Sequence, residues 1–179
     1  FEPELGEDFG QLREWPRENV VKLLVFCHPD DDVDTKKTQE ERVKRLFTAA
    51  RRNDLEFLLE VIPSKVGPVD DMTTPKLIQQ FYDVGVYPDW WKLEPALDPV
   101  YWRQVGEVID AHDSHCQGVI VLGLNGTIEG ISEAFNAASK QPWVKGFAIG
   151  RTLFAEAAQG WLQGHLDDAQ AIKLMATNY

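Results

Sequence analysis

The sequence predicts an α/β protein made of about five βα units, which correspond to the C-terminal part, strands 4–8, of a (β/α)8 TIM barrel. From residue 19 onward, short apolar segments alternate with amphipathic segments that carry helix-start signals, the pattern of repeated βα units. The apolar segments are nearly continuous, as in parallel strands buried on both faces. An open five-stranded doubly wound sheet is the alternative, because 179 residues suffice for it and a complete barrel needs three more strands.

Each predicted strand is an apolar run bounded by turn-forming residues. The five runs are 20–27, 57–62, 90–94, 118–123 and 146–150. A helix-start signal follows each run. These signals are the capping box Thr38-Gln39-Glu40-Glu41, the N-cap and first-turn proline pairs Thr74-Pro75 and Asp98-Pro99, then Thr127, then Arg151 directly after the last strand, and Asp167 or Asp168 for a final helix. Residues 1–18 are expected to be an irregular or linker segment, so the barrel part spans 19–179.

Composition narrows the classes of function. Acidic residues outnumber basic ones by 29 to 18, and the formal charge of -11 repels nucleic acid and an anionic membrane surface. No apolar stretch reaches about eighteen residues, so no membrane span is expected. The two cysteines, Cys27 and Cys116, form no Cys-x-x-Cys pair, which favours a reducing, cytoplasmic location. The chain begins at Phe1 without a signal-peptide pattern, and we expect it to be an internal piece of a longer protein.

Charged residues inside three consecutive predicted strands indicate chemistry. Lys22, Glu60 and Lys92 each interrupt an apolar run, and an unpaired buried charge costs several kcal/mol. If the faces that carry them all point into a barrel, the three side chains converge. A second cation and an apolar surrounding both favour the neutral lysine amine that attacks a carbonyl, while a carboxylate moves the protons.

Each of these residues also has a structural interpretation. Lys22 alone is typical of a surface lysine that extends its ammonium into solvent. Glu60, and Lys92 paired with Glu94 on the same strand face, are equally compatible with structural ion pairs. Their joint occurrence on consecutive strands favours the chemical interpretation, in which Glu94 lies among the substrate-binding residues.

The last two strands end in residues that suit a phosphate. Gly123 and Asn125 follow the fourth strand, and Gly150 with Arg151 joins the fifth directly to a helix. In barrels these final loops commonly bind phosphate through backbone N–H groups and a helix N-terminus, and an arginine adds a bidentate contact. The alternative is a tight turn at Gly150 with a solvated Arg151.

Two other polar clusters are weaker candidates. The acidic loop after the first strand, residues 28–34, lacks the spacing of a calcium loop, and no metal is predicted there. Within it His28 is the better candidate, because it ends the strand on the face of Lys22 and could reach a ligand. Residues 112–116 include two histidines and a cysteine, yet they lie between a helix and a strand, opposite the expected site.

The combined motifs resemble a known family. In order and spacing they are similar to the last five strands of the tagatose-bisphosphate type of class I aldolase, and more closely to the aldolase-like domain found behind 5-dehydro-2-deoxygluconokinase in bacterial myo-inositol catabolism. The resemblance covers residue 19 to the C-terminus. The motifs that carry it are Val21-Lys22-Leu23-Leu24, Phe57-Leu58-Leu59-Glu60-Val61, Asp89-Trp90-Trp91-Lys92-Leu93-Glu94, Leu122-Gly123-Leu124 and Val144-Lys145-Gly146-Phe147-Ala148-Ile149-Gly150-Arg151-Thr152.

The resemblance implies roles for these residues. Lys92 would be the Schiff-base lysine, Glu60 the proton-transfer residue, Lys22 a cation that orients substrate or carboxylate, and Gly150 with Arg151 part of the phosphate site. It implies cleavage of the sugar phosphate 6-phospho-5-dehydro-2-deoxygluconate to dihydroxyacetone phosphate and malonate semialdehyde, without metal or other cofactor. A fused or associated sugar kinase is the implied partner.

Two departures and two alternatives accompany these expectations. The aldolases carry a polar pair on their first strand, which this chain does not contain, and many have Ser-Ala-Gly where this chain has Leu122-Gly123-Leu124. One alternative is a non-catalytic domain that accompanies a fused sugar kinase. The other is an open-sheet, receiver-like domain that uses Asp30, Asp31 and Asp32 for a divalent ion. Open sheet edges call for further residues or a partner, which includes a second copy.

Overall fold

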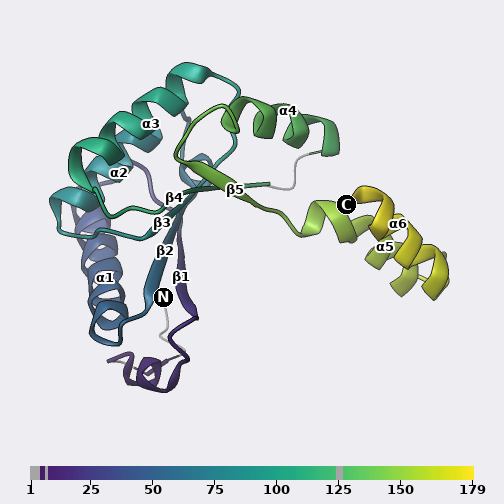
Figure 1. Cartoon of the computed structure of the whole chain (residues 1–179), viewed down its shortest axis with the longest axis horizontal. Coiled ribbons are helices and arrows are strands. Elements are labelled where there is room, and N and C mark those ends of the chain that lie inside the picture. Colours follow the sequence, from purple (N-terminus) through teal and green to yellow (C-terminus); the bar gives the residue numbers. More distant parts are fainter. Residues whose placement is uncertain (1–4, 7, 124–126) are drawn as a thin grey trace.

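The computed structural model describes residues 5–6, 8–123 and 127–179 and contains one parallel sheet of five strands (Figure 1). The strands are hydrogen-bonded in the order in which they occur along the chain, β1-β2-β3-β4-β5. Their bounds are β1 Val20–Val25, β2 Glu56–Val61, β3 Trp90–Leu93, β4 Gly118–Leu122 and β5 Val144–Ala148. All five strands therefore occur close to the predicted apolar runs.

The strand order identifies the architecture as five βα units of a (β/α) barrel. A doubly wound sheet reverses its strand order at a switch point, whereas these strands follow one another without reversal. Right-handed crossovers between successive strands then place the helices on one side of the sheet. Figure 1 shows α1 to α4 along that side. The helices are α1 Val33–Arg52, α2 Thr73–Asp83, α3 Pro99–His112, α4 Ile128–Ala138, α5 Arg151–Leu162 and α6 Asp168–Asn178, with short 3-10 helices η1 Gly10–Glu14 and η2 Pro63–Lys65.

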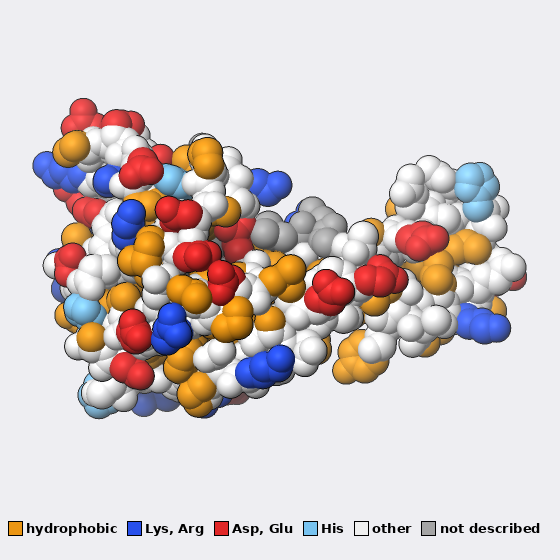
Figure 2. All heavy atoms as spheres, turned by 90° about the horizontal axis from the view of Figure 1, so that it is seen from above, with side chains coloured by type: hydrophobic (Ala, Val, Ile, Leu, Met, Phe, Trp, Pro, Cys, Tyr) orange, Lys and Arg blue, Asp and Glu red, His pale blue; other side chains and the backbone are white. Residues whose placement is uncertain are grey.

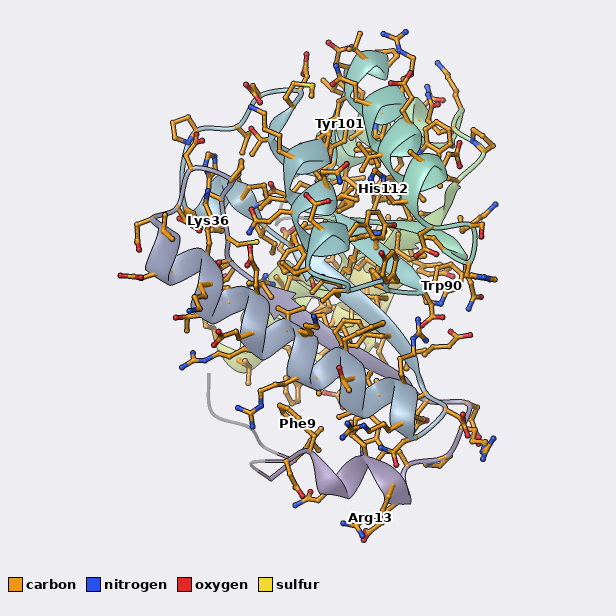
Figure 3. The ribbon with its side chains drawn as sticks, turned by 90° about the vertical axis from the view of Figure 1, so that its left-hand side faces the viewer. Phe9, Arg13, Lys36, Trp90, Tyr101 and His112 are labelled. Atoms are coloured by element: carbon orange, nitrogen blue, oxygen red, sulfur yellow. The ribbon has the colours of Figure 1, made fainter. Side chains whose placement is uncertain are left out.

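The hydrophobic core lies between this sheet face and the helices. The strand side chains that point toward the helices are almost completely buried: Val21, Leu23, Phe57, Leu59, Val61, Trp91, Leu93, Val119 and Val121. Trp91 packs against the rings of Phe81 and Tyr82 of α2, and its indole N–H donates to the Tyr82 hydroxyl at 3.0 Å. Figure 3 shows α1, α2 and α3 in front of the sheet from this side. This face fixes the strand backbones.

The opposite sheet face differs from the sequence expectation. We expected strands buried on both faces, but no helix of the described residues covers the second face, and Val20 and the Lys22 side chain are 39% and 44% exposed. The reason is topological, because sequential right-handed crossovers place every connecting helix on the same side. The chemically interesting residues lie on this second face.

The helix starts agree with the sequence in four cases. Asp98 and Thr127 cap α3 and α4 with their side chains, α5 begins at Arg151, and Asp167 forms a capping box with Gln170 at the start of α6. The Thr38 capping box was wrong. Helix α1 begins at Val33, because Asp32, six residues before Thr38, is the N-cap, and its carboxylate accepts the Thr35 N–H at 2.9 Å.

Helix α2 also begins differently from the prediction. It starts at Thr73 rather than after an N-cap at Thr74, and its N-cap residue Met72 makes no side-chain hydrogen bond. The Thr73 hydroxyl donates instead to the Asp70 carboxylate at 2.7 Å, which ties the preceding loop to the helix. Pro75 therefore lies at the third helical position.

The two ends of the chain lie away from the sheet centre. In the N-terminal segment, η1 places Leu12 and Phe9 in the core, and Phe9 lies between η1 and α1 in Figure 3. Helices α5 and α6 pack against each other as a hairpin that projects from the body of the molecule (Figures 1 and 2). No helix in the described part of the chain is long and apolar enough to cross a membrane.

Candidate active site

The structure brings Lys22, Glu60 and Lys92 together on the sheet face that no helix covers. Parallel pairing sets Glu60 of β2 directly beside Lys92 of β3, in one row that continues through Ile120 of β4. Lys22 of β1 pairs with Leu58, one row earlier, so it approaches Glu60 diagonally. Because side chains of a strand alternate between faces, the three residues share one face as the sequence predicted.

Glu60 is the centre of this cluster. Its side chain is 5% exposed, Oε2 lies 2.5 Å from Lys22 Nζ, and Oε1 lies 3.3 Å from Lys92 Nζ. A buried carboxylate needs such partners, because an unpaired charge would be costly at this depth. One carboxylate shared by two ammonium groups leaves the cluster with a net positive charge.

The two lysines occupy different surroundings. The Lys92 side chain is 18% exposed and lines a pocket of about 360 Å³. The Lys22 side chain is 44% exposed and does not line that pocket. Of the two amines, Lys92 is therefore the one that a bound molecule would meet.

The pocket lies at the carboxyl ends of the strands. Residues at or just after the end of every strand line it, together with the start of α5. They include Phe26, Ile62, Lys92, Leu122 and Ala148, one from each strand or the position that follows it. This is the end of a (β/α) barrel at which active sites are built.

The predicted phosphate-binding residues meet this same pocket. Gly123, Gly150 and Arg151 all line it, and Gly150 is the N-cap of α5. Gly123 also has a packing role, because a Cβ there would approach the Ile149 side chain to 2.7 Å. Asn125 lies outside the described residues.

His28 and Glu94 lie outside the pocket lining. His28 is buried, its Nε2 lies 2.8 Å from the Pro68 carbonyl, and its Nδ1 accepts the Asp30 N–H at 3.2 Å. Glu94 is also buried, and its carboxylate accepts the Ser64 hydroxyl and the Ser64 N–H. Both side chains are held by neighbouring loops, and their place among the substrate-binding residues stays a prediction.

Lys65 is a pocket residue that the sequence reasoning missed. It ends η2, directly after β2, and lines the pocket with Lys92 and Arg151. The signal was present, because any loop that follows a strand of a parallel barrel lies at the active-site end. With Lys65, Lys92 and Arg151 against Glu60, the pocket carries three cations and one carboxylate, in a chain whose formal charge is -11.

The other polar clusters remain apart from this pocket. Asp32 caps α1, and the Asp31 carboxylate accepts the His28 N–H at 2.8 Å. Hydrogen bonds from Thr35 hold the pKa of Asp32 below its usual value. His112 lies at the opposite end of the sheet, where it stacks on Tyr82. Among the described residues, no group of three or more His, Cys, Asp or Glu side chains is placed to hold a metal ion.

Comparison with known proteins gives a family and a fold. The family described as "Uncharacterized protein conserved in bacteria (DUF2090)" matches residues 1–179. No curated protein matches the chain. Among solved structures, fructose-bisphosphate aldolase from Plasmodium falciparum, in a ternary complex with TRAP and a small molecule inhibitor, matches with a TM-score of 0.61 and 16% identity over 89% of this chain and 53% of that one.

A second solved structure, the protein Cgl0159 from Corynebacterium glutamicum, matches with a TM-score of 0.53 and 20% identity over 89% of this chain and 52% of that one. The chain thus spans about half the length of the two solved structures that it matches. At these identities the similarity is one of fold. It agrees with the barrel architecture inferred from the strand order.

Proposed function

The chain belongs to the DUF2090 family of proteins conserved in bacteria and has the fold of part of an aldolase barrel, and from this premise we propose that it is the Schiff-base part of a class I aldolase. The observation that carries the proposal is the Glu60 carboxylate held between Lys22 and Lys92, with Lys92 facing a cationic pocket at the carboxyl ends of the strands.

In this proposal Lys92 is the nucleophile. Its neutral amine adds to the ketone carbon of the substrate and gives a carbinolamine, which loses water to form an iminium. The Glu60 carboxylate then takes the proton of the hydroxyl on the β-carbon, and the bond between the α- and β-carbons breaks. Its electron pair forms an enamine with the nitrogen, and the β-carbon leaves as an aldehyde. Protonation of the enamine and addition of water release the ketone product and restore the lysine.

Glu60 is the group that moves protons in these steps. Its Oε1 lies 3.3 Å from Lys92 Nζ, close to the distance at which a general acid or base acts on a neighbouring group. Lys22 holds the other oxygen at 2.5 Å, which fixes the carboxylate and supplies a second cation beside the amine. The cluster thus combines a nucleophile, a proton carrier and a positioning cation.

The substrate in our proposal is 6-phospho-5-dehydro-2-deoxygluconate, cleaved to dihydroxyacetone phosphate and malonate semialdehyde. Two points support an anionic sugar derivative: the pocket's excess of cations, and Gly150 with Arg151 at the start of α5, where backbone N–H groups and the helix dipole favour phosphate. The sequence resemblance supports the identity of the sugar, and with it an associated 5-dehydro-2-deoxygluconokinase.

Borohydride trapping tests the proposed nucleophile. The intact protein is incubated with dihydroxyacetone phosphate, reduced with sodium borohydride and analysed by peptide mass spectrometry. We expect an adduct on the peptide that contains Lys92. Lys92→Met should abolish it, and Lys37→Met, a matched change at an exposed lysine of α1 outside the pocket, should not. An adduct on Lys22, or none, would overturn the assignment.

Cleavage of 6-phospho-5-dehydro-2-deoxygluconate, followed through the dihydroxyacetone phosphate released, tests the substrate. We expect Lys92→Met to remove the activity. If this variant cleaves the substrate as fast as the unchanged protein, the aldolase proposal is wrong, and a non-catalytic domain beside a sugar kinase becomes the better interpretation.

A further inference from the structure

Besides Arg151 at the proposed phosphate position, the pocket has a second cationic side chain without an ion-pair partner among the described residues, that of Lys65. Lys65 lines the pocket at the end of β2, and Arg151 lines it at the end of β5. Within residues 5–6, 8–123 and 127–179, no carboxylate forms an ion pair with either side chain. A cation on a pocket without a carboxylate partner can take its counter-charge from a ligand.

The backbone beneath Lys65 is held in place. Glu94, at the end of β3, accepts both the hydroxyl and the N–H of Ser64, and the Ser64 N–H lies 3.3 Å from Glu94 Oε2. The Pro63 carbonyl accepts the N–H groups of Val66 at 2.9 Å and Gly67 at 3.1 Å. Because this turn is fixed before any ligand arrives, only the Lys65 side chain needs to be ordered on binding.

The strand order separates the two cations. Three strand spacings of about 4.8 Å lie between β2 and β5, roughly 14 Å along the sheet and less across its curved face. Lys92 of β3 lies between them. A ligand that reaches both cations would therefore carry an anionic group at each end and present its middle to Lys92.

We propose that Lys65 binds a second anionic group of the substrate, at the end opposite the phosphate bound by Gly150 and Arg151. This inference rests on the proposed aldolase function and adds a residue that selects substrates with two charged ends. In the substrate proposed above this second group is the carboxylate, and a phosphate is the alternative, since a lysine ammonium recognises both as a point charge. A charge-assisted hydrogen bond of this kind changes affinity by roughly 10- to 100-fold.

Binding of three phosphorylated polyols tests the proposal without any reaction. Glucitol 6-phosphate has one anionic end, 6-phosphogluconate adds a carboxylate at the other, and mannitol 1,6-bisphosphate adds a phosphate; none has a ketone for Lys92. Calorimetric titration should show that the intact protein prefers one of the doubly charged ligands over glucitol 6-phosphate by roughly 10-fold or more. The preferred ligand identifies the second group.

Variants assign that preference to Lys65. Lys65→Gln should reduce it to near unity while glucitol 6-phosphate binds as before, Lys65→Arg should retain it, and Lys37→Gln should behave like the unchanged protein. Equal affinity for all three ligands in the unchanged protein, or a preference that survives Lys65→Gln, would overturn the inference. Because these ligands form no Schiff base, the binding test is independent of the borohydride test. If borohydride traps no adduct but Lys65→Gln still loses the preference, the aldolase function is rejected and the Lys65 site is retained.

Discussion

The two ion pairs of Glu60 differ in a way that a double-mutant cycle can measure. Lys22 is the closer partner, at 2.5 Å, but its side chain is 44% exposed, whereas Lys92 is at 3.3 Å and 18% exposed. In water-like surroundings with a dielectric constant of about 80, the 2.5 Å contact is worth roughly 1.7 kcal/mol. At an effective dielectric constant of about 20, the 3.3 Å contact is worth roughly 5 kcal/mol before desolvation is subtracted.

Burial should therefore outweigh distance. After solvent screening of the exposed lysine we expect a coupling of about 1 kcal/mol or less between Lys22 and Glu60. After the desolvation penalty we expect about 2–3 kcal/mol between Lys92 and Glu60. The assay is urea unfolding of Lys22→Met, Lys92→Met and Glu60→Gln, and of each lysine change combined with Glu60→Gln. A Lys22 coupling as large as the Lys92 coupling would show that distance decides and would refute this reasoning.

Two further predictions follow from shifted pKa values. Burial, with a smaller contribution from Asp31, raises the pKa of Cys27 to about 12. In a Cys116→Ser variant at pH 8, the Cys27 thiol should therefore not react with a disulfide reagent while the chain is folded, and it should react once urea unfolds the chain. Labelling of the folded chain at the rate of the unfolded chain would contradict this. Hydrogen bonds from Thr35 lower the pKa of Asp32 below its ordinary value of 3.8. The ionised Asp32 cap therefore stabilises the folded chain above pH 3.8, and this stabilisation is lost as the pH falls through the lower pKa of the folded state. Asp32→Asn keeps a capping side chain that does not titrate. Urea unfolding at a series of pH values should show that this variant loses less of its free energy of unfolding in acid than the unchanged protein does. An equal loss in the two proteins would contradict the assignment.

The sequence predicted the sheet well because its signals are local. Apolar runs placed all five strands within two residues of their observed bounds. For β5 both bounds were predicted two residues too late, since Gly146 was taken as the strand start and the strand covers Val144–Ala148. A glycine inside a strand is uncommon. Gly146 pairs with Ile120, which in turn pairs with Lys92, so the missing side chain leaves space beside Ile120.

Contacts between distant residues limited the prediction of the site. His28 was placed near the ligand from strand alternation, but its partner is the carbonyl of Pro68, forty residues away. Glu94 was assigned to the substrate for the same reason, and its partner Ser64 is thirty residues away. A spacing rule cannot indicate such partners, because they depend on how two loops meet at the end of the sheet.

The alternation of strand side chains explains how the cluster is held. Glu60 lies between Leu59 and Val61, both 0% exposed, and Lys92 lies between Trp91 and Leu93, also 0% exposed. These neighbours anchor the backbone on the helix-covered face, so the charged side chains on the other face start from fixed positions. Since Glu60 and Lys92 are also direct partners in the β2–β3 register, their separation is set mainly by the sheet itself. The proton-transfer pair that we propose, Glu60 and Lys92, would therefore need little reorganisation when a substrate binds, which is what preorganised catalysis requires.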